Sequence, residues 1–264
     1  MTARGAARRP LSLPPVIGHR GASAYAPENT LAGFHAARAL GCSWVEFDVR
    51  LTGDGALAVS HDDRLGRTTD GRGRISGLAL SAIRKLDAGR WFSDKFAGER
   101  VPTLEEAIRV CGEIGLGANV EIKAERGRGP ATAAAVAAYL DSMAEILPPI
   151  LISSFLPDAI AEAGARAPAI PRGVLFKKIP RGWRDIAAKL GCTTIHAGHA
   201  DLDESLAAEI GDAGYPLLAY TVNDAERARQ LFGWGVASVF SDVPDIMLLA
   251  AAEAWAASRK GVVL

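Results

Sequence analysis

The sequence lacks the features of a membrane-spanning or disulfide-stabilised protein. No uninterrupted apolar stretch approaches the ~20 residues that a helix needs to cross a bilayer. The three cysteines, Cys42, Cys111 and Cys192, are far apart and have no paired spacing. Cysteines of this kind argue against a disulfide framework and against a zinc site, and they favour a reduced compartment. We therefore expect a cytoplasmic protein with no stable membrane anchor.

The sequence also lacks an excess of charge of either sign. Lysine plus arginine and aspartate plus glutamate number 30 each among 264 residues, so the overall charge does not favour nucleic acid or an anionic membrane surface as a partner. The first residues contain arginines and prolines but lack the apolar segment of roughly 7–15 residues found in secretory signals. We expect residues 1–14 to form a flexible tail and residues 15–264 to form a single domain.

Short apolar strands and helical stretches alternate along this domain. Candidate strands begin near residues 16, 44, 118, 150, 173, 193, 216 and 237, with helical patterns between them. Eight strand–helix units predict an α/β fold, a closed parallel (β/α)8 barrel of the TIM type. A doubly wound open sheet is the structural rival, but no G-x-G-x-x-G follows the first strand.

The second strand is followed by a hairpin and then by an irregular segment. The Asp54-Gly55 pair predicts a tight turn, after which residues 56–60 run back along the strand. Residues 63–101 are rich in Gly, Arg and Asp and only weakly periodic. We interpret residues 63–101 as a small insertion after the second strand, with short helices of its own.

Two helix starts carry capping signals. Thr103 and Glu106 form a capping-box pattern before a helix that contains Leu104 and Ile108. Nearer the N-terminus, Asn29 is the expected cap of a helix that begins close to residue 31.

Acidic residues stand near the ends of two strands, where the active site of such a barrel forms. Glu46 and Asp48 are two residues apart in an apolar strand, so they point to the same face. Glu121 and Lys123 repeat this spacing on the next unit. An alternating strand with a solvated polar face would give the same pattern. However, buried carboxylates are costly unless they are paired or metal-bound, so three acids and one lysine favour a cation, with Lys123 helping to hold an anion.

Two histidines flank the acidic pair. His19 ends the first strand, and the hairpin returns His61 towards Glu46 and Asp48. A pair of imidazoles suits proton transfer to and from a reacting oxygen, although a lone histidine at a strand end is often a structural residue. Arg20, directly after His19, can place two donors on phosphate oxygens.

Three further residues end later strands of the predicted barrel. Phe155 is a candidate apolar wall for a leaving group, and Asn223 is a candidate substrate contact. His196 is a further candidate for the lining of the pocket. Each of these residues could equally be a core or strand-end residue without a functional role.

Several motifs together resemble the glycerophosphodiester phosphodiesterase family. They are H-R-G-A-S-A-Y-A-P-E-N-T, E-F-D-V-R-L-T-x-D-G, S-H-D-D-R-L-G-R-T-T, L-D-A-G-R-W-F, F-A-G-E-R-V-P-T-L-E-E, V-E-I-K and T-V-N. They run from about residue 17 to residue 245, in the same order as in the family. Two departures are Tyr220, where the family often has tryptophan, and Ser241, where threonine is commoner. Both concern the leaving-group side of the pocket.

The resemblance implies roles for the residues at the strand ends. Glu46, Asp48 and Glu121 match the family's metal ligands, and one Mg²⁺ or Ca²⁺ ion is the implied cofactor, which an all-oxygen ligand set does not distinguish. His19 and His61 match the acid/base pair, and Arg20 and Lys123 match the phosphate contacts.

The expected activity is hydrolysis of a small-molecule glycerophosphodiester to sn-glycerol 3-phosphate and an alcohol. A lysophospholipase D-type enzyme on the same barrel is the nearer alternative, and a non-catalytic binder of a phosphate ligand is the more distant one. The sequence leaves open the alcohol head group, the choice of cation, the oligomeric state and which histidine acts as the acid.

Overall fold

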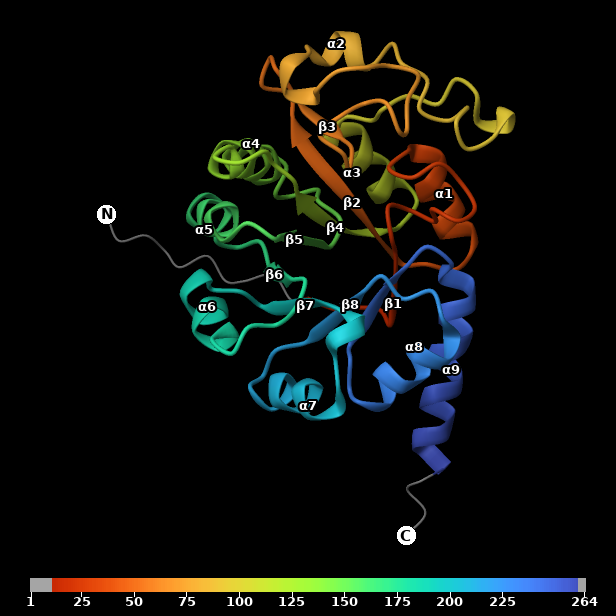
Figure 1. Cartoon of the computed structure of the whole chain (residues 1–264), viewed down its shortest axis with the longest axis vertical. Coiled ribbons are helices and arrows are strands. Elements are labelled where there is room, and N and C mark those ends of the chain that lie inside the picture. Colours follow the sequence, from red (N-terminus) through yellow and green to blue (C-terminus); the bar gives the residue numbers. More distant parts are fainter. Residues whose placement is uncertain (1–10, 261–264) are drawn as a thin grey trace.

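The computed structural model describes residues 11–260, without the side chains of residues 257–260. In this part of the chain eight parallel strands form a closed barrel, in which β1 pairs with both β9 and β2, and helices surround the strands (Figure 1). The predicted (β/α)8 barrel is therefore confirmed. The parallel strands are β1 Val16–Gly18, β2 Trp44–Leu51, β4 Gly117–Ile122, β5 Ile150–Ser154, β6 Arg172–Phe176, β7 Thr194–Gly198, β8 Leu217–Tyr220 and β9 Ser238–Ser241.

The side chains of β2 alternate between two environments. Val45, Phe47 and Val49 belong to the large apolar core that the strands share with the helices. Trp44 belongs to a smaller cluster made mainly of strand residues, so its face of β2 is directed into the barrel. Glu46 and Asp48 share that face because successive strand residues alternate. The barrel interior is thus apolar at the N-terminal end of β2 and acidic further along.

Helices cover the outside of the barrel and follow the predicted pattern. They are α1 Leu31–Ala39, α3 Leu104–Glu113, α4 Gly129–Ser142, α5 Pro157–Arg166, α6 Trp183–Leu190, α7 Glu204–Asp212, α8 Ala225–Gly233 and α9 Pro244–Lys260. The capping box at the start of α3 is confirmed, because Thr103 accepts from the Glu106 N–H and Glu106 accepts from the Thr103 N–H.

The predicted cap of α1 is wrong by one residue. The Thr30 hydroxyl, not the Asn29 side chain, accepts from the N–H of Gly33. Asn29 instead adopts a left-handed conformation with φ of 57°. This conformation leaves the Asn29 amide free for a role in the site described below.

The hairpin and the insertion lie where the sequence predicted them. Strand β3, Leu57–Val59, runs antiparallel to β2 and pairs with it from Val49 to Leu51. The insertion over residues 63–101 contains the short helix α2, Leu80–Ile83, and two 3₁₀ turns. Its apolar residues form a small cluster with Ala58 of β3, and Figure 1 shows the insertion above one side of the barrel.

The first described residues lie against the barrel. Leu11 and Leu13 pack on the interior cluster that contains Trp44, and the carbonyl of Pro14 accepts from the Ser238 hydroxyl at 2.6 Å. Residues 1–10 of the expected flexible tail lie outside the described residues. Among residues 11–260, no helix combines the length and the apolar character that crossing a membrane requires.

Candidate active site

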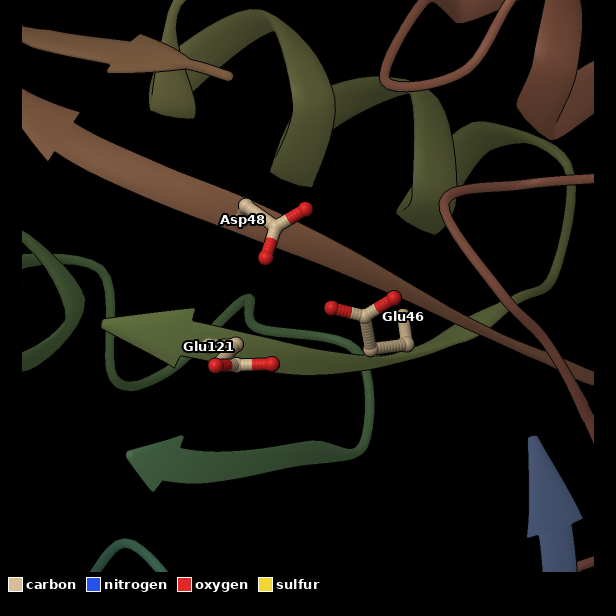
Figure 2. Close-up of side chains that lie close together, drawn as sticks. All are labelled: Glu46, Asp48 and Glu121. Carbon is tan, nitrogen blue, oxygen red and sulfur yellow. The ribbon is translucent and has the colours of Figure 1, made fainter. Parts of the chain in front are cut away.

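Three buried carboxylates meet on neighbouring faces of β2 and β4. Glu46 and Asp48 come from β2, and Glu121 comes from the neighbouring strand β4, in register with Asp48. Figure 2 shows the three side chains grouped over these two strands. One carboxylate oxygen from each residue lies within 4.8 Å of those from the other two, and the residues are only 3%, 1% and 6% exposed. The sequence expectation that these acids face one another is therefore met.

Asp48 is held in its ionised form. The Asn29 amide donates to Asp48 Oδ2 at 2.8 Å, and its oxygen accepts from the Asp48 N–H at 3.1 Å. Lys123 Nζ and Arg20 Nε each lie 3.4 Å from an Asp48 oxygen. Burial alone would raise the pKa of Asp48, but the charges of Lys123 and Arg20 lower it to about 2. Asp48 is therefore an anion at neutral pH.

Glu46 and Glu121 are shifted in the opposite direction. Burial, together with the negative charge of Asp48, raises the pKa of Glu46 well above its ordinary value. Burial and Asp48 also raise the pKa of Glu121 to about 7, although Lys123 opposes this shift. Within residues 11–260, Glu46 Oε1 has no hydrogen-bond partner. A buried carboxylate oxygen without a donor, beside two further carboxylates, fits a divalent cation with oxygen ligands.

Two cationic side chains border the acidic group. Arg20 has a left-handed backbone with φ of 52°, and its N–H donates to Glu46 Oε2 at 3.0 Å. Lys123 Nζ lies 2.5 Å from Glu121 Oε1 and 5.3 Å from the centre of the Phe155 ring. Burial would lower the pKa of Lys123, but Asp48 and Glu121 raise it, so Lys123 stays protonated. Both cations can therefore contribute positive charge to an anionic ligand.

His19 is oriented by a carboxylate on the last strand. Its Nδ1 lies 2.7 Å from Asp242 Oδ1, and its Nε2 lies 4.0 Å from Glu46 Oε2. Ser23 and Asn223 donate to Asp242 at 2.5 and 2.6 Å. His19 and Ser23 contribute to lowering the pKa of Asp242 against the effect of burial. Since Nδ1 is engaged by Asp242, Nε2 is the nitrogen left for the pocket.

Asn223 is placed differently from the other candidate substrate contacts. Its amide nitrogen is engaged by Asp242, and its oxygen accepts from the hydroxyl of Ser241 and from the N–H of Asp242. Asn223 does not line the cavity between the carboxylates and the two histidines, but it lines a neighbouring one with His19 and Arg20, and its direct role towards substrate stays a prediction. The observed contacts make Asn223 a support for the carboxylate that orients His19.

His61 is oriented by a second carboxylate and by the insertion. Its Nδ1 lies 2.8 Å from Asp62 Oδ1, and Asp62 accepts from Arg67 Nε at 2.6 Å. Arg67 also donates to both oxygens of Glu28, which in turn accepts from Arg20 at 2.8 Å. Burial lowers the pKa of His61, whereas Arg67 holds that of Asp62 at about 2. Paired charges therefore connect His61 to Arg20 across the mouth of the barrel.

A cavity of about 240 Å³ opens between these groups. It is lined by His19, Arg20, Glu46, His61, Asn119, Glu121, Lys123, Phe155, Leu175, His196, Tyr220, Thr221 and Phe240. One cavity therefore brings together the two histidines, the two cations, two of the three carboxylates and Phe155. His196 also lines this cavity, which is the position expected for it.

The sequence interpretation missed several residues of the site. Glu28 and Asn29 stand within P-E-N-T, and Arg67 within L-G-R-T-T, but nothing local in the sequence gives their contacts. Asn119 could have been found, because it precedes Glu121 by two residues and therefore shares its face of β4.

Comparison with known proteins agrees with this geometry. The model of the glycerophosphoryl diester phosphodiesterase family matches residues 19–246. A glycerophosphodiester phosphodiesterase of Caldanaerobacter subterraneus is 32% identical over 88% of this chain and 96% of its own length. The chain belongs to the glycerophosphoryl diester phosphodiesterase family.

Solved structures of similar proteins share the barrel. A phosphodiesterase of Oleispira antarctica, in complex with the product sn-glycerol-3-phosphate, is 41% identical, with a TM-score of 0.87 over 91% of this chain and 97% of that one. A glycerophosphodiester phosphodiesterase of Agrobacterium tumefaciens is 27% identical, with a TM-score of 0.77 over 90% of this chain and 100% of that one. The resemblance and the enzyme class expected from the sequence, a phosphoric diester hydrolase, are confirmed.

The raised pKa values in this family member predict a pH-dependent affinity for cations. Near pH 7 the metal-free Glu121 carries a proton in about half of the molecules, since its pKa is about 7, and a cation must displace that proton. The raised pKa of Glu46 acts in the same direction. Apparent affinity for Mg²⁺ or Ca²⁺ should therefore rise between pH 6 and pH 8, within about one unit of the pKa of Glu121, and binding at pH 7 should release protons. Titration calorimetry in buffers of different ionisation enthalpy measures both the affinity and the number of protons released. Equal affinity at both pH values without proton release would contradict this assignment.

Proposed function

We propose that the protein hydrolyses water-soluble glycerophosphodiesters to sn-glycerol 3-phosphate and an alcohol. The observation that carries this proposal is one cavity lined by two carboxylate-bound histidines, two cations and two members of a group of three buried carboxylates. The bound product named for the Oleispira antarctica phosphodiesterase, which is 41% identical, supports the same substrate class.

Glu46, Asp48 and Glu121 would hold a divalent cation, Mg²⁺ or Ca²⁺. When bound, such an ion supplies positive charge that offsets the negative charge developing on the phosphoryl oxygens. Arg20 and Lys123 act on the same charge, because both line the cavity next to the acidic group. Charge that is already in place in a buried site stabilises a transition state without further reorganisation.

His19 and His61 would carry the protons. One imidazole accepts the proton of the attacking hydroxyl, and the other donates a proton to the oxygen of the departing alcohol as its bond to phosphorus breaks. Asp242 and Asp62 each engage Nδ1, which directs Nε2 towards the reacting groups. The family resemblance implies that the 2-hydroxyl of the glycerol attacks first, giving a cyclic phosphate that water then opens.

We also propose that residues 15–264 act as one domain. The barrel closes between β1 and β2, and the insertion is joined to it through the β2–β3 hairpin and through Arg67. A cytoplasmic location stays a prediction from the sequence.

The activity is tested by a coupled assay for glycerol 3-phosphate. Glycerophosphocholine and glycerophosphoethanolamine should be hydrolysed in the presence of Mg²⁺ or Ca²⁺, because the cation completes the charge balance of the site. A chelator should reduce the rate at least about a hundredfold, and added cation should restore it. Preferential turnover of micellar lysophosphatidylcholine would indicate the lipid-directed alternative. Binding of glycerol 3-phosphate without turnover of any diester would indicate the non-catalytic one.

Substitution of the two histidines tests the proposed proton transfer. His19→Ala and His61→Ala should each lower kcat by about 10²–10⁴-fold, the range for loss of a general acid or base. His35→Ala is the matched control, because His35 is exposed on α1 outside the cavity, and its kcat should equal that of the wild type.

The roles of the two histidines can be separated through Asp62. The hydrogen bond that the His61 ring donates to Asp62 raises the pKa of His61, so Asp62→Asn should lower that pKa further. The limb of the pH–rate profile that His61 controls should then move to lower pH. A shift of the acidic limb would show that His61 is the base, and a shift of the basic limb would show that it is the acid.

Activity within twofold of the wild type for His19→Ala or His61→Ala would refute the proposed role of that histidine in proton transfer.

A further inference from the structure

One arginine of the insertion bridges two carboxylates at the rim of the active site. Arg67 Nε donates to Asp62 Oδ2 at 2.6 Å, and its two terminal nitrogens donate to both oxygens of Glu28 at 2.6 and 2.7 Å. Glu28 lies between β1 and α1, whereas Asp62 follows β3. All three nitrogens of the guanidinium are thus engaged, in a planar fork that fixes the geometry of the carboxylates as well as balancing their charge.

Each of these carboxylates also holds a group of the proposed reaction. The other oxygen of Asp62 lies 2.8 Å from Nδ1 of His61. Glu28 Oε1 accepts from a terminal nitrogen of Arg20 at 2.8 Å. Arg67 itself lines neither the active-site cavity nor the neighbouring cavity that contains Glu28. It therefore acts on the site through the two carboxylates and not by contact with a ligand.

The loop that presents Arg67 is anchored in the insertion. Leu65 is buried in the apolar cluster that the insertion forms with Ala58 of β3. The N–H of Leu65 donates to the carbonyl of Gly73 at 3.1 Å, and the carbonyl of Leu65 accepts from the buried hydroxyl of Thr69 at 2.6 Å. The fold of the insertion therefore sets the position of the guanidinium.

Both carboxylates depend on Arg67 for their charge and their orientation. Burial would raise the pKa of Glu28, but Arg67 and Arg20 lower it. Without Arg67, the Glu28 side chain would keep only Arg20 as a hydrogen-bond partner among residues 11–260, and the Asp62 side chain would keep only the ring of His61. Each carboxylate could then turn about its side-chain bonds, and the group that it orients would lose its fixed place.

We infer, on the basis of the proposed function, that Arg67 is a positioning residue that aligns His61 for proton transfer and Arg20 for phosphate binding at the same time. The insertion thereby takes part in catalysis. Small displacements of such groups lower the rate, because the reacting atoms must be aligned. Exposed ion pairs contribute little to stability, and the side chain of Arg67 is 46% exposed. The loss of Arg67 should therefore appear in catalysis and not in folding.

The kinetics of Arg67→Ala test this role, with glycerophosphocholine as substrate and Mg²⁺ present. We expect kcat/KM to fall about 10–100-fold, the range for residues that support the groups around a metal site. Both constants should change, with a lower kcat through His61 and a higher KM through Arg20. Arg67→Lys should recover only part of the loss, because an ammonium lacks the planar fork. The melting temperatures of both variants should stay within about 3 °C of the wild type.

Chemical rescue distinguishes positioning from a structural role. Guanidinium chloride at millimolar concentration, far below denaturing levels, should raise kcat/KM of Arg67→Ala several-fold, because the ion can bind Glu28 and Asp62 in place of the side chain. Methylammonium chloride at the same concentration should not, because it cannot form two parallel hydrogen bonds with a carboxylate. Neither salt should change the kinetics of the wild type.

The two halves of the bridge can be separated by combined substitutions. Asp62→Asn alone should mainly lower kcat, and Glu28→Gln alone should mainly raise KM. If Arg67 acts through these carboxylates, Arg67→Ala should lower kcat by no more than about a further twofold in the Asp62→Asn background. It should likewise raise KM by no more than about a further twofold in the Glu28→Gln background.

Arg74→Ala is the matched control. Arg74 also belongs to the insertion, its side chain is 49% exposed, and it pairs with Asp63 and Glu125 at 2.5 and 3.4 Å. It lines neither the active-site cavity nor the neighbouring cavity that contains Glu28. Its substitution removes a similar bridge from the same lobe, and kcat and KM should equal those of the wild type.

The outcomes separate the role of Arg67 from the proposed function. Wild-type kinetics for Arg67→Ala would overturn the inference and leave its ion pairs as surface contacts. A loss of activity that guanidinium does not restore would also overturn it and assign Arg67 to the folding of the insertion. Both results leave the proposed function intact, provided that the wild type hydrolyses glycerophosphodiesters. Absence of turnover by the wild type would reject the proposed function itself, and the inference with it.

Discussion

Mutual repulsion among three buried carboxylates is the constraint around which this protein is organised. Glu46, Asp48 and Glu121 lie close together inside a barrel, where charges interact more strongly than in water. Arg20 and Lys123 balance mainly Asp48, whose pKa is low, while the pKa values of the two glutamates are raised. The metal-free site is thus a set of oxygen ligands that is neutralised only in part, which is the condition that favours a divalent cation.

The rest of the site positions groups around this centre. His19 follows β1 and His61 follows the β2–β3 hairpin, and each has a carboxylate on Nδ1. Asp242 is supplied by the turn after β9, whereas Asp62 follows the hairpin that leads into the insertion. Arg67, from the insertion, ties Asp62 to Glu28, and Glu28 contacts Arg20. The insertion therefore contributes to the site itself, because its Arg67 holds Asp62, which in turn orients His61.

Local patterns were sufficient for part of this arrangement. The two-residue spacing of Glu46 and Asp48 places them on one face of a strand, and the Asp54-Gly55 turn returns the chain so that His61 lies near them. The barrel itself followed from eight alternating units. Contacts between distant residues could not be predicted in this way. Asp242 lies 223 positions from His19, and Asn29 binds Asp48 instead of capping α1. The bridge from Arg67 to Glu28, 39 positions away, depends in the same way on how the insertion lies against the barrel.

The proposed chemistry of the site depends most directly on where a cation binds. A crystal structure with Mn²⁺ and sn-glycerol 3-phosphate, with the ion located by its anomalous scattering, measures this position. We expect one ion within about 2.0–2.6 Å of oxygens from Glu46, Asp48 and Glu121, with the phosphate beside Arg20 and Lys123. An ion bound elsewhere, or a phosphate held away from both cations while the three carboxylates remain unliganded, would contradict the account.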